Sequence, residues 1–366
     1  MIRPHRLLLA AWVVALLGAR LSPELASAAN GAAWLLCAVC LLRHEQLRAG
    51  LRVSLAGLSA LALALIWLVD SYGVWDPQDA WRWLLGWGAP LLAAFVMVRR
   101  PESQGAVYRG LAGFGALLGA ATIVVWTSSP GRASALFGNP NITAAVLVGM
   151  LPFAFAWQAR KHQIIVAACM LVGLASTGSR GGMLAALIMM VAALLVSRAG
   201  RRAWLVAAAG LLVVVPFAAQ RMSRLADDPY AQGRMLWWRA AWRVSQEQPQ
   251  GVGTRQFGWH GLRQRDAVQA PVYRYLRGEA GESAHSEWVQ LYVDHGPLGP
   301  LALILAASIL LARSPRRLEQ LGLLGLLAHA AVDGTWQSEM VRMLLLCHAM
   351  ALWRFGSGLP SRVPAT

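Results

Sequence analysis

The sequence is poor in charged residues and in cysteine. Charged residues make up 14% of its 366 residues, whereas soluble domains carry about 25%. With 57% hydrophobic residues, this scarcity excludes an ordinary soluble domain and also a disordered chain, which needs low hydrophobicity and high charge. Four cysteines are too few for a disulfide-stapled secreted module. The composition that remains is that of a polytopic membrane protein.

Lysine is nearly absent as well. Lys161 is the only lysine among 33 basic residues, so the net charge of +16 comes almost entirely from arginine. Genomic base composition is one explanation of this bias. Phosphate binding is an equally good one, because arginine binds phosphate through two hydrogen bonds and lysine cannot. A basic chain often binds nucleic acid. Here many arginines stand in short loops between apolar runs, so we expect no nucleic-acid partner.

Motifs for metals and for common soluble enzymes are missing. Cys37-x-x-Cys40 has no second pair to complete a zinc site, and Asp227-Asp228 before Pro229 is typical of a turn or a helix cap. The sequence contains no HExxH, Walker or GxSxG motif. We therefore expect neither a metal nor a cofactor.

Apolar runs are what the sequence has in abundance. A membrane-spanning helix needs about 20 mostly apolar residues. Candidate spans lie near 7–20, 25–42, 51–69, 81–98, 106–126, 141–157, 162–177, 181–197, 203–219, 287–312, 320–333 and 340–354. Gly296-Pro297 interrupts the tenth, so its first part is expected to be half-buried rather than spanning. These runs predict an all-α polytopic integral membrane protein of about twelve transmembrane helices.

The loop charges predict the orientation of these helices. Short loops rich in Lys and Arg face the cytoplasm. Such loops, at Arg43, Arg99, Arg160, Arg198 and Arg313, alternate with loops that together hold fewer basic residues and most of the loop acids. These other loops contain Arg20, Arg132 and Arg180 with Glu24, Asp70, Asp76, Asp79, Asp333 and Glu339. Both termini are then cytoplasmic. The N-terminus resembles a signal peptide, but a second span follows directly, so we expect the first helix to stay uncleaved.

One loop is far longer than the others. Residues 220–284 separate the ninth and tenth spans, and the alternation places them outside the cytoplasm. The spacing of Met235, Trp238 and Trp242 predicts an amphipathic helix at the membrane interface. We divide the chain into spans 1–9 (1–219), this partly helical loop (220–284), and spans 10–12 with a cytoplasmic tail (285–366).

Two arginine motifs are candidate anion sites at the outer ends of helices. Ser179-Arg180-Gly181-Gly182 joins two spans, and glycines there let the backbone turn tightly or approach a ligand. A snorkelling arginine is the alternative. In the long loop, Gly251-Val252-Gly253 reads as a turn with exposed amides, which together with Arg234 and Arg255 would bind an anionic group. A purely structural turn is the alternative.

A histidine and two asparagines complete the set of candidates. His285 stands where the long loop re-enters the membrane, and a neutral imidazole there would accept a proton from a hydroxyl. Glu282 or Glu287 would orient it or stabilise the imidazolium, whereas a satisfied polar contact is the alternative role. Asn139 and Asn141, around Pro140, are either helix-start residues or sugar and phosphate contacts.

These motifs, in this order, resemble the O-antigen ligase and polymerase superfamily, which includes lipid A-core:O-antigen ligases, O-antigen polymerases and bacterial O-oligosaccharyltransferases. The resemblance covers roughly residues 130–310. The matching pieces are Phe137 to Asn141, Ser179-Arg180-Gly181, Gly233-Arg234 with Trp238, Pro249 to Gly253, and His285 to Leu291 with Gly296 and Gly299. The chain departs from the family at Ser286-Glu287, since many members have Asn after the histidine.

The resemblance implies a metal-independent inverting glycosyltransferase in the bacterial inner membrane, with its site facing the periplasm. The donor would be a glycan on undecaprenyl diphosphate. Arg180 and Arg234 match the arginines that bind the diphosphate, and His285 matches the histidine proposed to activate the acceptor. A lipid A-core acceptor is favoured because the chain is short, with another glycan or a protein hydroxyl as alternatives. A twelve-helix transporter and a non-catalytic scaffold are the rivals from other classes.

Overall fold

The computed structural model describes residues 101–129, 131–196, 219, 223, 229–253, 257, 258, 260, 283–313, 317–336 and 338–356. The predicted spans 7–20, 25–42, 51–69 and 81–98 lie outside these residues, as does 203–219 except for its last residue. Arg255, Glu282 and the sequence pairs Cys37/Cys40 and Asp227/Asp228 also lie outside them.

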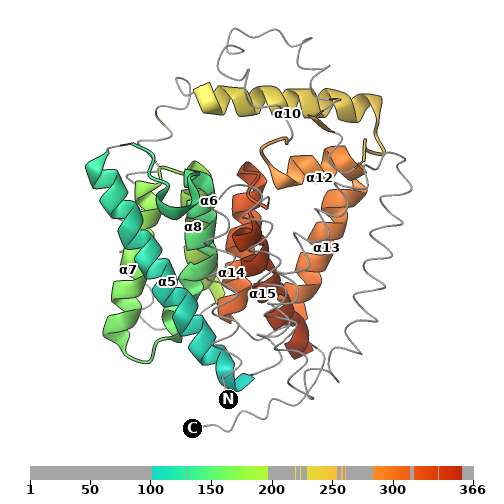
Figure 1. Cartoon of the computed structure of the whole chain (residues 1–366). Helices are drawn as coiled ribbons and strands as arrows, with labels where there is room; N and C mark the ends of the chain where they lie inside the picture. The colour runs from blue at the N-terminus through green and yellow to red at the C-terminus, as the bar shows by residue number, and fades with distance from the viewer. Residues whose placement is uncertain are drawn as a thin grey trace, which may run out of the picture.

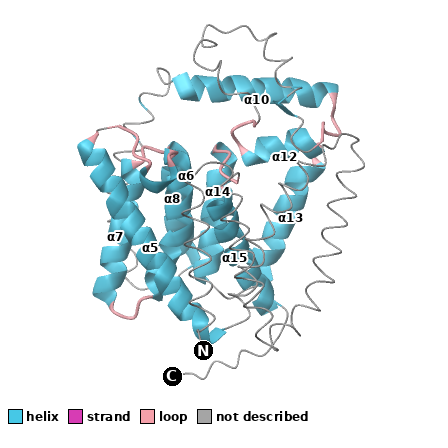
Figure 2. Ribbon diagram, viewed as in Figure 1, coloured by secondary structure: helices cyan, strands magenta, loops and turns pink. Residues whose placement is uncertain are grey.

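Every element in the described part of the chain is a helix, and none of it is strand (Figure 2). The all-α prediction is confirmed to this extent, and the total of twelve spans stays a prediction. Helices cover the other predicted spans. They are α5 (Pro101–Ser128), α6 (Pro140–Met150) with the 3-10 segment η2 (Leu151–Ala156), α7 (Arg160–Ser176), α8 (Arg180–Val196), α13 (Leu298–Arg313), α14 (Arg317–Val332) and α15 (Glu339–Gly356).

The tenth predicted span is broken where the sequence indicates. Helix α12 (Glu287–His295) occupies only its first part. Gly296 then adopts φ 62°, and α13 starts at Leu298. A positive φ is accessible to glycine because it has no Cβ. A Cβ at this position would also lie 2.5 Å from the carbonyl oxygen of Pro249. The expected break is therefore confirmed, and residues 287–292 are half-buried as predicted.

Helix α10 (Pro229–Glu247) lies across one end of the bundle (Figure 1). The same end carries the segments after α5, α7 and α14, so the helices alternate in direction as the loop charges predict. Trp237 is buried against Phe257 and Val293 in a small second core, whereas Trp242 on the opposite side of α10 is 59% exposed. The predicted amphipathic helix is thus present.

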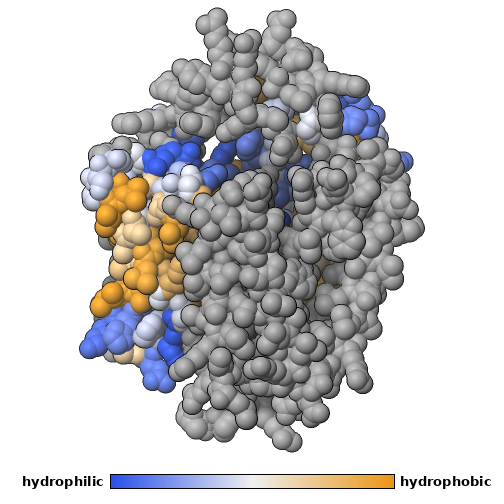
Figure 3. All heavy atoms as spheres, viewed as in Figure 1, coloured by the Kyte–Doolittle hydropathy of each residue, from blue (hydrophilic) through white to orange (hydrophobic). Residues whose placement is uncertain are grey.

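On the coloured part of the face shown in Figure 3, apolar residues form a band between polar residues at either end. Leu117 and Val124 of α5 and Ile165 of α7 are among its exposed residues. By length and composition, one described helix, Val107–Ser128 within α5, is suited to cross a membrane, and the other apolar helices are shorter. Exposed apolar side chains in such a band match the hydrocarbon of a bilayer.

A buried histidine satisfies a backbone carbonyl at the point where α6 changes into a 3-10 helix. The chain tightens to a 3-10 helix at Leu151, with Pro152 next, and the Gly149 carbonyl accepts a hydrogen bond from Nε2 of His348 over 2.9 Å. The carbonyl only accepts, so this nitrogen carries the proton. The His348 ring also stacks on Phe153 with centroids 4.8 Å apart. His348 therefore has a structural role here, because an unsatisfied carbonyl inside a membrane is costly.

Two glycines allow α5 and α7 to touch through their backbones. A Cβ at Gly119 would lie 2.3 Å from the carbonyl oxygen of Cys169, and a Cβ at Gly173 would lie 2.4 Å from the Cα of Gly119. Small residues at such crossings let membrane helices pack closely, since packing replaces the hydrophobic effect as a driving force in lipid.

We predict that Gly119→Ala lowers the thermal stability of the protein in detergent, because backbone atoms cannot yield to the added methyl group as a side chain would. Overpacking of this kind costs about 1–3 kcal/mol. Intrinsic tryptophan fluorescence during heating measures the effect. Gly113→Ala, on the same helix with nothing within 4 Å of its added Cβ, is the control, and an equal loss in both variants would contradict the prediction.

Candidate functional site

The site is built around the end of α14. A helix leaves its last four carbonyls without intrahelical partners. Side chains from two other elements supply donors here: Nη1 of Arg234 donates to the Val332 carbonyl over 3.2 Å, and the Ser286 hydroxyl donates to the Ala331 carbonyl over 2.8 Å. An arginine also suits the partial negative charge at a helix C-terminus. The unsatisfied end of α14 thus brings α10 and the start of α12 to one place.

Arg234 makes a second, charged contact at the same point. Its Nη2 lies 3.1 Å from both carboxylate oxygens of Asp333, the residue that follows α14. Burial raises the pKa of the Asp333 carboxyl, and the nearby charges of Arg234 and Arg132 oppose that shift. A quarter of the Arg234 side chain is exposed. The predicted diphosphate-binding arginine is therefore oriented in advance and still accessible.

The Arg180 motif lies beside α14, at the start of α8. The Ser179 hydroxyl accepts a hydrogen bond from the Gly182 amide over 3.2 Å, as an N-cap does. A Cβ at Gly181 would lie 2.7 Å from Cγ2 of Val332, and one at Gly182 would lie 2.7 Å from the Cβ of Ala144. The two glycines therefore allow close helix packing, and ligand approach at this motif stays a prediction. They bring Arg180 to the ends of α14 and α6.

His285 occupies a turn with an unusual backbone. Its φ is 52°, a left-handed value that costs a non-glycine residue roughly 1–3 kcal/mol and persists only where the surroundings enforce it. Three hydrogen bonds do so. The His285 amide donates to Ser283 Oγ over 3.1 Å, the Ala284 amide donates to Gln290 Oε1 over 2.8 Å, and Trp238 Nε1 donates to the Ala284 carbonyl over 3.0 Å. Strained residues held in this way cluster at functional sites.

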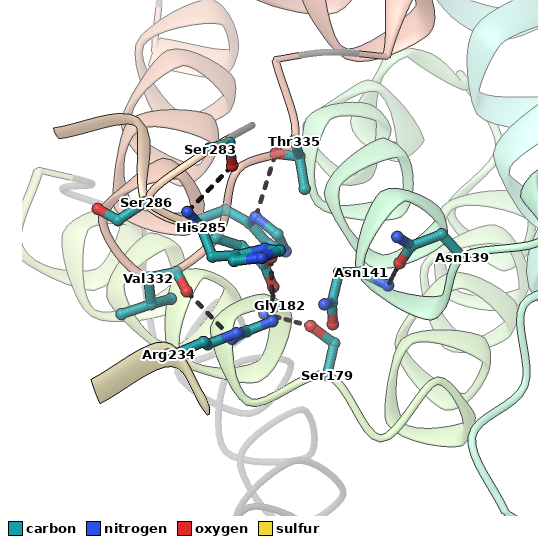
Figure 4. A network of polar contacts seen from close by, with 12 residues as sticks. Asn139, Asn141, Ser179, Gly182, Arg234, Ser283, His285, Ser286, Val332 and Thr335 are labelled. Atoms are coloured by element: carbon teal, nitrogen blue, oxygen red, sulfur yellow. Dashed lines mark hydrogen bonds and ion pairs between the residues drawn. The ribbon is translucent and has the colours of Figure 1, made fainter. Parts of the chain in front are cut away.

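His285 lies next to the Arg234–Asp333 pair. A Cβ added at Gly334 would be 3.4 Å from the Cα of His285, so the backbone after Asp333 packs against the histidine. Figure 4 shows His285, Arg234, Ser179 and Asn141 gathered at one end of the bundle, although they come from four separate segments. The structure thus brings together the three motifs that carry the predicted catalytic residues.

Ser286 and Glu287, where the chain departs from the family pattern, have defined roles. Ser286 caps α12 by accepting from the Val289 amide over 3.3 Å. Glu287 accepts a hydrogen bond from the Trp336 amide over 2.7 Å, which ties α12 to the segment between α14 and α15. Burial raises the pKa of the Glu287 carboxyl to about 7. The hydrogen bond from Trp336 and the charge of Arg342 lower this pKa, and the Asp333 charge raises it.

Asn139 and Asn141 have different structural roles. Asn139 caps α6, since its Oδ1 accepts from the Asn141 amide over 2.8 Å. The Asn141 side chain instead faces the site, and its Oδ1 accepts from Nη2 of Arg132 over 2.5 Å. Capping thus explains Asn139, while Asn141 adds a polar contact that capping does not explain.

The predicted exposed amides of the Gly251-Val252-Gly253 turn are not present. The Gly251 amide donates to the Gln248 carbonyl, the Val252 amide to the Val293 carbonyl, and the Gly253 amide to the Asp294 carbonyl, at 2.9–3.0 Å. The prediction of an amide cradle for an anion is therefore wrong. These glycines instead join the end of α10 to the end of α12, and Gly251 has φ 96°.

Three residues of this end of the bundle, Asp333, Arg132 and His329, were not among the predicted site residues. Asp333 and Arg132 have already been described. His329 is fully buried on α14, with Nδ1 3.5 Å from the Thr335 hydroxyl. An ionisable residue inside an apolar span is itself a signal of a functional site, and His329 and Asp333 are four residues apart on one helix face. This pair of ionisable residues, four apart in an apolar run of the sequence, is the signal from which both could have been predicted as site residues.

The arrangement is suited to anions rather than to metals. Arginine guanidinium groups and an imidazole are donors or neutral acceptors, whereas a metal site needs several convergent ligands. Among the described residues, no group of three His, Cys, Asp or Glu side chains is placed to bind a metal.

We predict that the protein loses stability as the pH rises from about 4.5 to about 7, because Glu287 retains a proton more strongly when folded. Its contribution is complete below the unfolded pKa near 4.5 and is lost as the pH passes the folded pKa. Glu287→Gln keeps an acceptor for the Trp336 amide and removes the titration. Melting temperatures measured from pH 5 to 8 should therefore fall less steeply in this variant, and parallel curves would contradict the assignment.

The comparison with known families identifies the segment that contains these residues. Residues 165–304 match a family model described as O-Antigen ligase. The match begins within α7, ends within α13 and contains Arg180, Arg234 and His285. None of the curated proteins compared with the chain matches it. The resemblance seen in the sequence is thus confirmed for residues 165–304, which are similar to the O-antigen ligases, a family of membrane proteins.

Proposed function

We propose that the protein transfers a glycan from undecaprenyl diphosphate to a hydroxyl of lipid A-core at the periplasmic face of the bacterial inner membrane. An O-antigen ligase domain indicates ligase or polymerase activity of the glycosyltransferase type. The observation that carries the proposal is the convergence of Arg180, Arg234 and His285 around the end of α14. These residues are far apart in the sequence, and packing alone does not require two arginines and a strained histidine at one point.

The chemistry needs a base and a stabilised leaving group. The acceptor oxygen attacks the anomeric carbon and forms a new C–O bond, while the bond from that carbon to the diphosphate oxygen breaks. The proton of the acceptor passes to His285, and the electron pair leaves with undecaprenyl diphosphate. Attack opposite the leaving group inverts the configuration at the anomeric carbon.

The arginines stabilise the charge that develops on the diphosphate. Donors oriented before the reaction, at a partly dry interface, stabilise such charge without reorganisation during the step. Arg234 is held by Val332 and Asp333 in that way. The α8 N-terminus, where Arg180 lies, adds a partial positive charge. Because arginine cannot lose its proton, these groups act only by charge and hydrogen bonding.

Other members of the superfamily suggest alternatives with the same donor. The protein would be a polymerase if the acceptor is another lipid-linked glycan, and an O-oligosaccharyltransferase if it is a protein hydroxyl. A transporter is the alternative from another class. Transporter sites lie near the bilayer midplane, whereas the residues described here lie at one end of the bundle (Figure 1).

We predict that His285→Ala lowers the transfer rate by about 10²–10⁴, which is the usual contribution of a general base. Lipopolysaccharide gels of a strain carrying only this variant provide the measurement. A ligase predicts loss of the O-antigen ladder with accumulation of lipid-linked polymer, whereas a polymerase predicts core with one repeat unit. An unchanged ladder, with the variant at normal level, would rule out both functions.

We also predict that transfer in washed membranes continues when EDTA is present, because guanidinium groups take the part of a metal in this mechanism. The rate of glycan transfer to added lipid A-core, with and without EDTA, provides the measurement. Loss of activity that Mg²⁺ or Mn²⁺ restores would contradict a metal-independent mechanism and would direct attention to the Asp227-Asp228 pair.

A further inference from the structure

A third arginine stands at the same end of the bundle. Arg132 belongs to the loop between α5 and α6, which the sequence analysis did not include in the site. Its Nη2 donates to Oδ1 of Asn141 over 2.5 Å. Its charge also acts on Asp333, since it opposes the rise in the pKa of that carboxyl which burial causes. Arg132 and Arg234 thus approach the same carboxylate from two separate segments.

Hydrogen bonds at Ala133 and Ser134 fix the loop that carries Arg132. The Ala133 amide donates to the Ser176 carbonyl at the end of α7 over 3.2 Å. The Ser134 carbonyl accepts from the Thr143 hydroxyl on α6 over 2.6 Å. Because the backbone is anchored to two helices, the guanidinium group does not need to be ordered when a ligand arrives, which lowers the entropic cost of binding.

Asn141 orients this guanidinium group without neutralising it. The Asn141 side chain is 9% exposed and its backbone is fixed by the Asn139 cap. An amide oxygen is uncharged, so this hydrogen bond selects a position for Arg132 and does not itself neutralise it. A purely structural clamp would be served equally well by a carboxylate, which binds arginine through charged hydrogen bonds. The choice of an amide therefore points to a role for the charge.

The charges of the cluster also favour a bound anion. Arg234 pairs with Asp333, and the charge of Arg132 also acts on that carboxyl, so two guanidinium groups lie near one carboxylate. The α8 N-terminus lies close to α6, where a Cβ at Gly182 would meet Ala144. Arg132, Arg180 and Arg234 are thereby carried by elements that meet at one place.

We propose that Arg132 is a third diphosphate-binding arginine and that Asn141 is its positioning residue. This inference rests on the proposed function and deepens it. Arg132 stabilises the negative charge that accumulates on the leaving diphosphate as the sugar–phosphate bond breaks. It neither gains nor loses a proton, and His285 remains the acceptor of the hydroxyl proton.

The first test removes the charge. Arg132→Ala should lower kcat for glycan transfer by about 10²-fold, as the loss of one preorganised donor does in other enzymes, with a smaller change in KM. Arg132→Lys should recover only part of the activity because the planar fork is lost. Arg239→Ala is the control, since Arg239 is an exposed arginine on α10 only five residues from Arg234. A kcat within about threefold of the wild type for Arg132→Ala would overturn the proposal.

The second test separates charge from structure. Asn141→Asp keeps an oxygen acceptor for Arg132 and leaves the Asn139 cap intact, so the melting temperature should be unchanged or higher. The added negative charge should nevertheless lower kcat, because it neutralises Arg132. Full activity in this variant would overturn the proposal, and the test stays valid even if Arg132→Ala fails to fold.

A double-mutant cycle tests whether Asn141 acts through Arg132. If it does, Asn141→Ala should lower kcat in the wild type and have no further effect on Arg132→Ala. Additive losses would overturn the positioning role. Arg180→Ala and His285→Ala, measured in parallel, separate this inference from the proposed function. If both retain full activity, the proposed function fails. If both lose activity and Arg132→Ala does not, only this inference fails.

Discussion

The C-terminal end of α14 is the constraint on which the rest of the site depends. Carbonyls that a helix leaves unsatisfied near a membrane need donors, and here Arg234 and Ser286 supply them. That requirement attaches α10 and the start of α12 to the bundle. Asp333, one residue further, then adds a charged partner for Arg234. The same side chain thus satisfies the helix end and holds a positive charge at the candidate site.

Preorganisation is the common feature of the residues gathered there. His285 is held in a left-handed backbone conformation by contacts with Gln290 and Trp238, and Arg132 is held by Asn141 on an anchored loop. These hydrogen bonds fix each polar group in position, and at His285 they offset the cost of its left-handed backbone. Such groups act on a developing charge without reorganising, which suits a reaction whose leaving group is a diphosphate.

Much of the fold could be predicted from hydropathy and a few breakers. The helices α5, α7, α8, α14 and α15 begin and end within a few residues of the predicted spans, because apolar runs of that length form helices in lipid. The division of the tenth span followed from Gly296-Pro297. The glycine pair after Arg180 and the Gly251–Gly253 turn were interpreted too functionally. Both lie in close contacts within the fold, the first against side chains of α14 and α6 and the second against the backbone at the end of α12, and glycine spacing alone does not distinguish a ligand from a neighbouring helix.

The sequence by itself determined the all-α class, the helices of the described residues, the family resemblance and the three candidate catalytic residues, since these depend on composition and on the local order of motifs. Only the tertiary structure decided which other side chains meet them. Asp333, His329 and Arg132 belong to segments far from His285 in the chain, and their partners are chosen by how α14, α6 and α10 pack. Contacts between distant segments leave no periodic signal in a single sequence, because each partner satisfies its own local pattern equally well without the other.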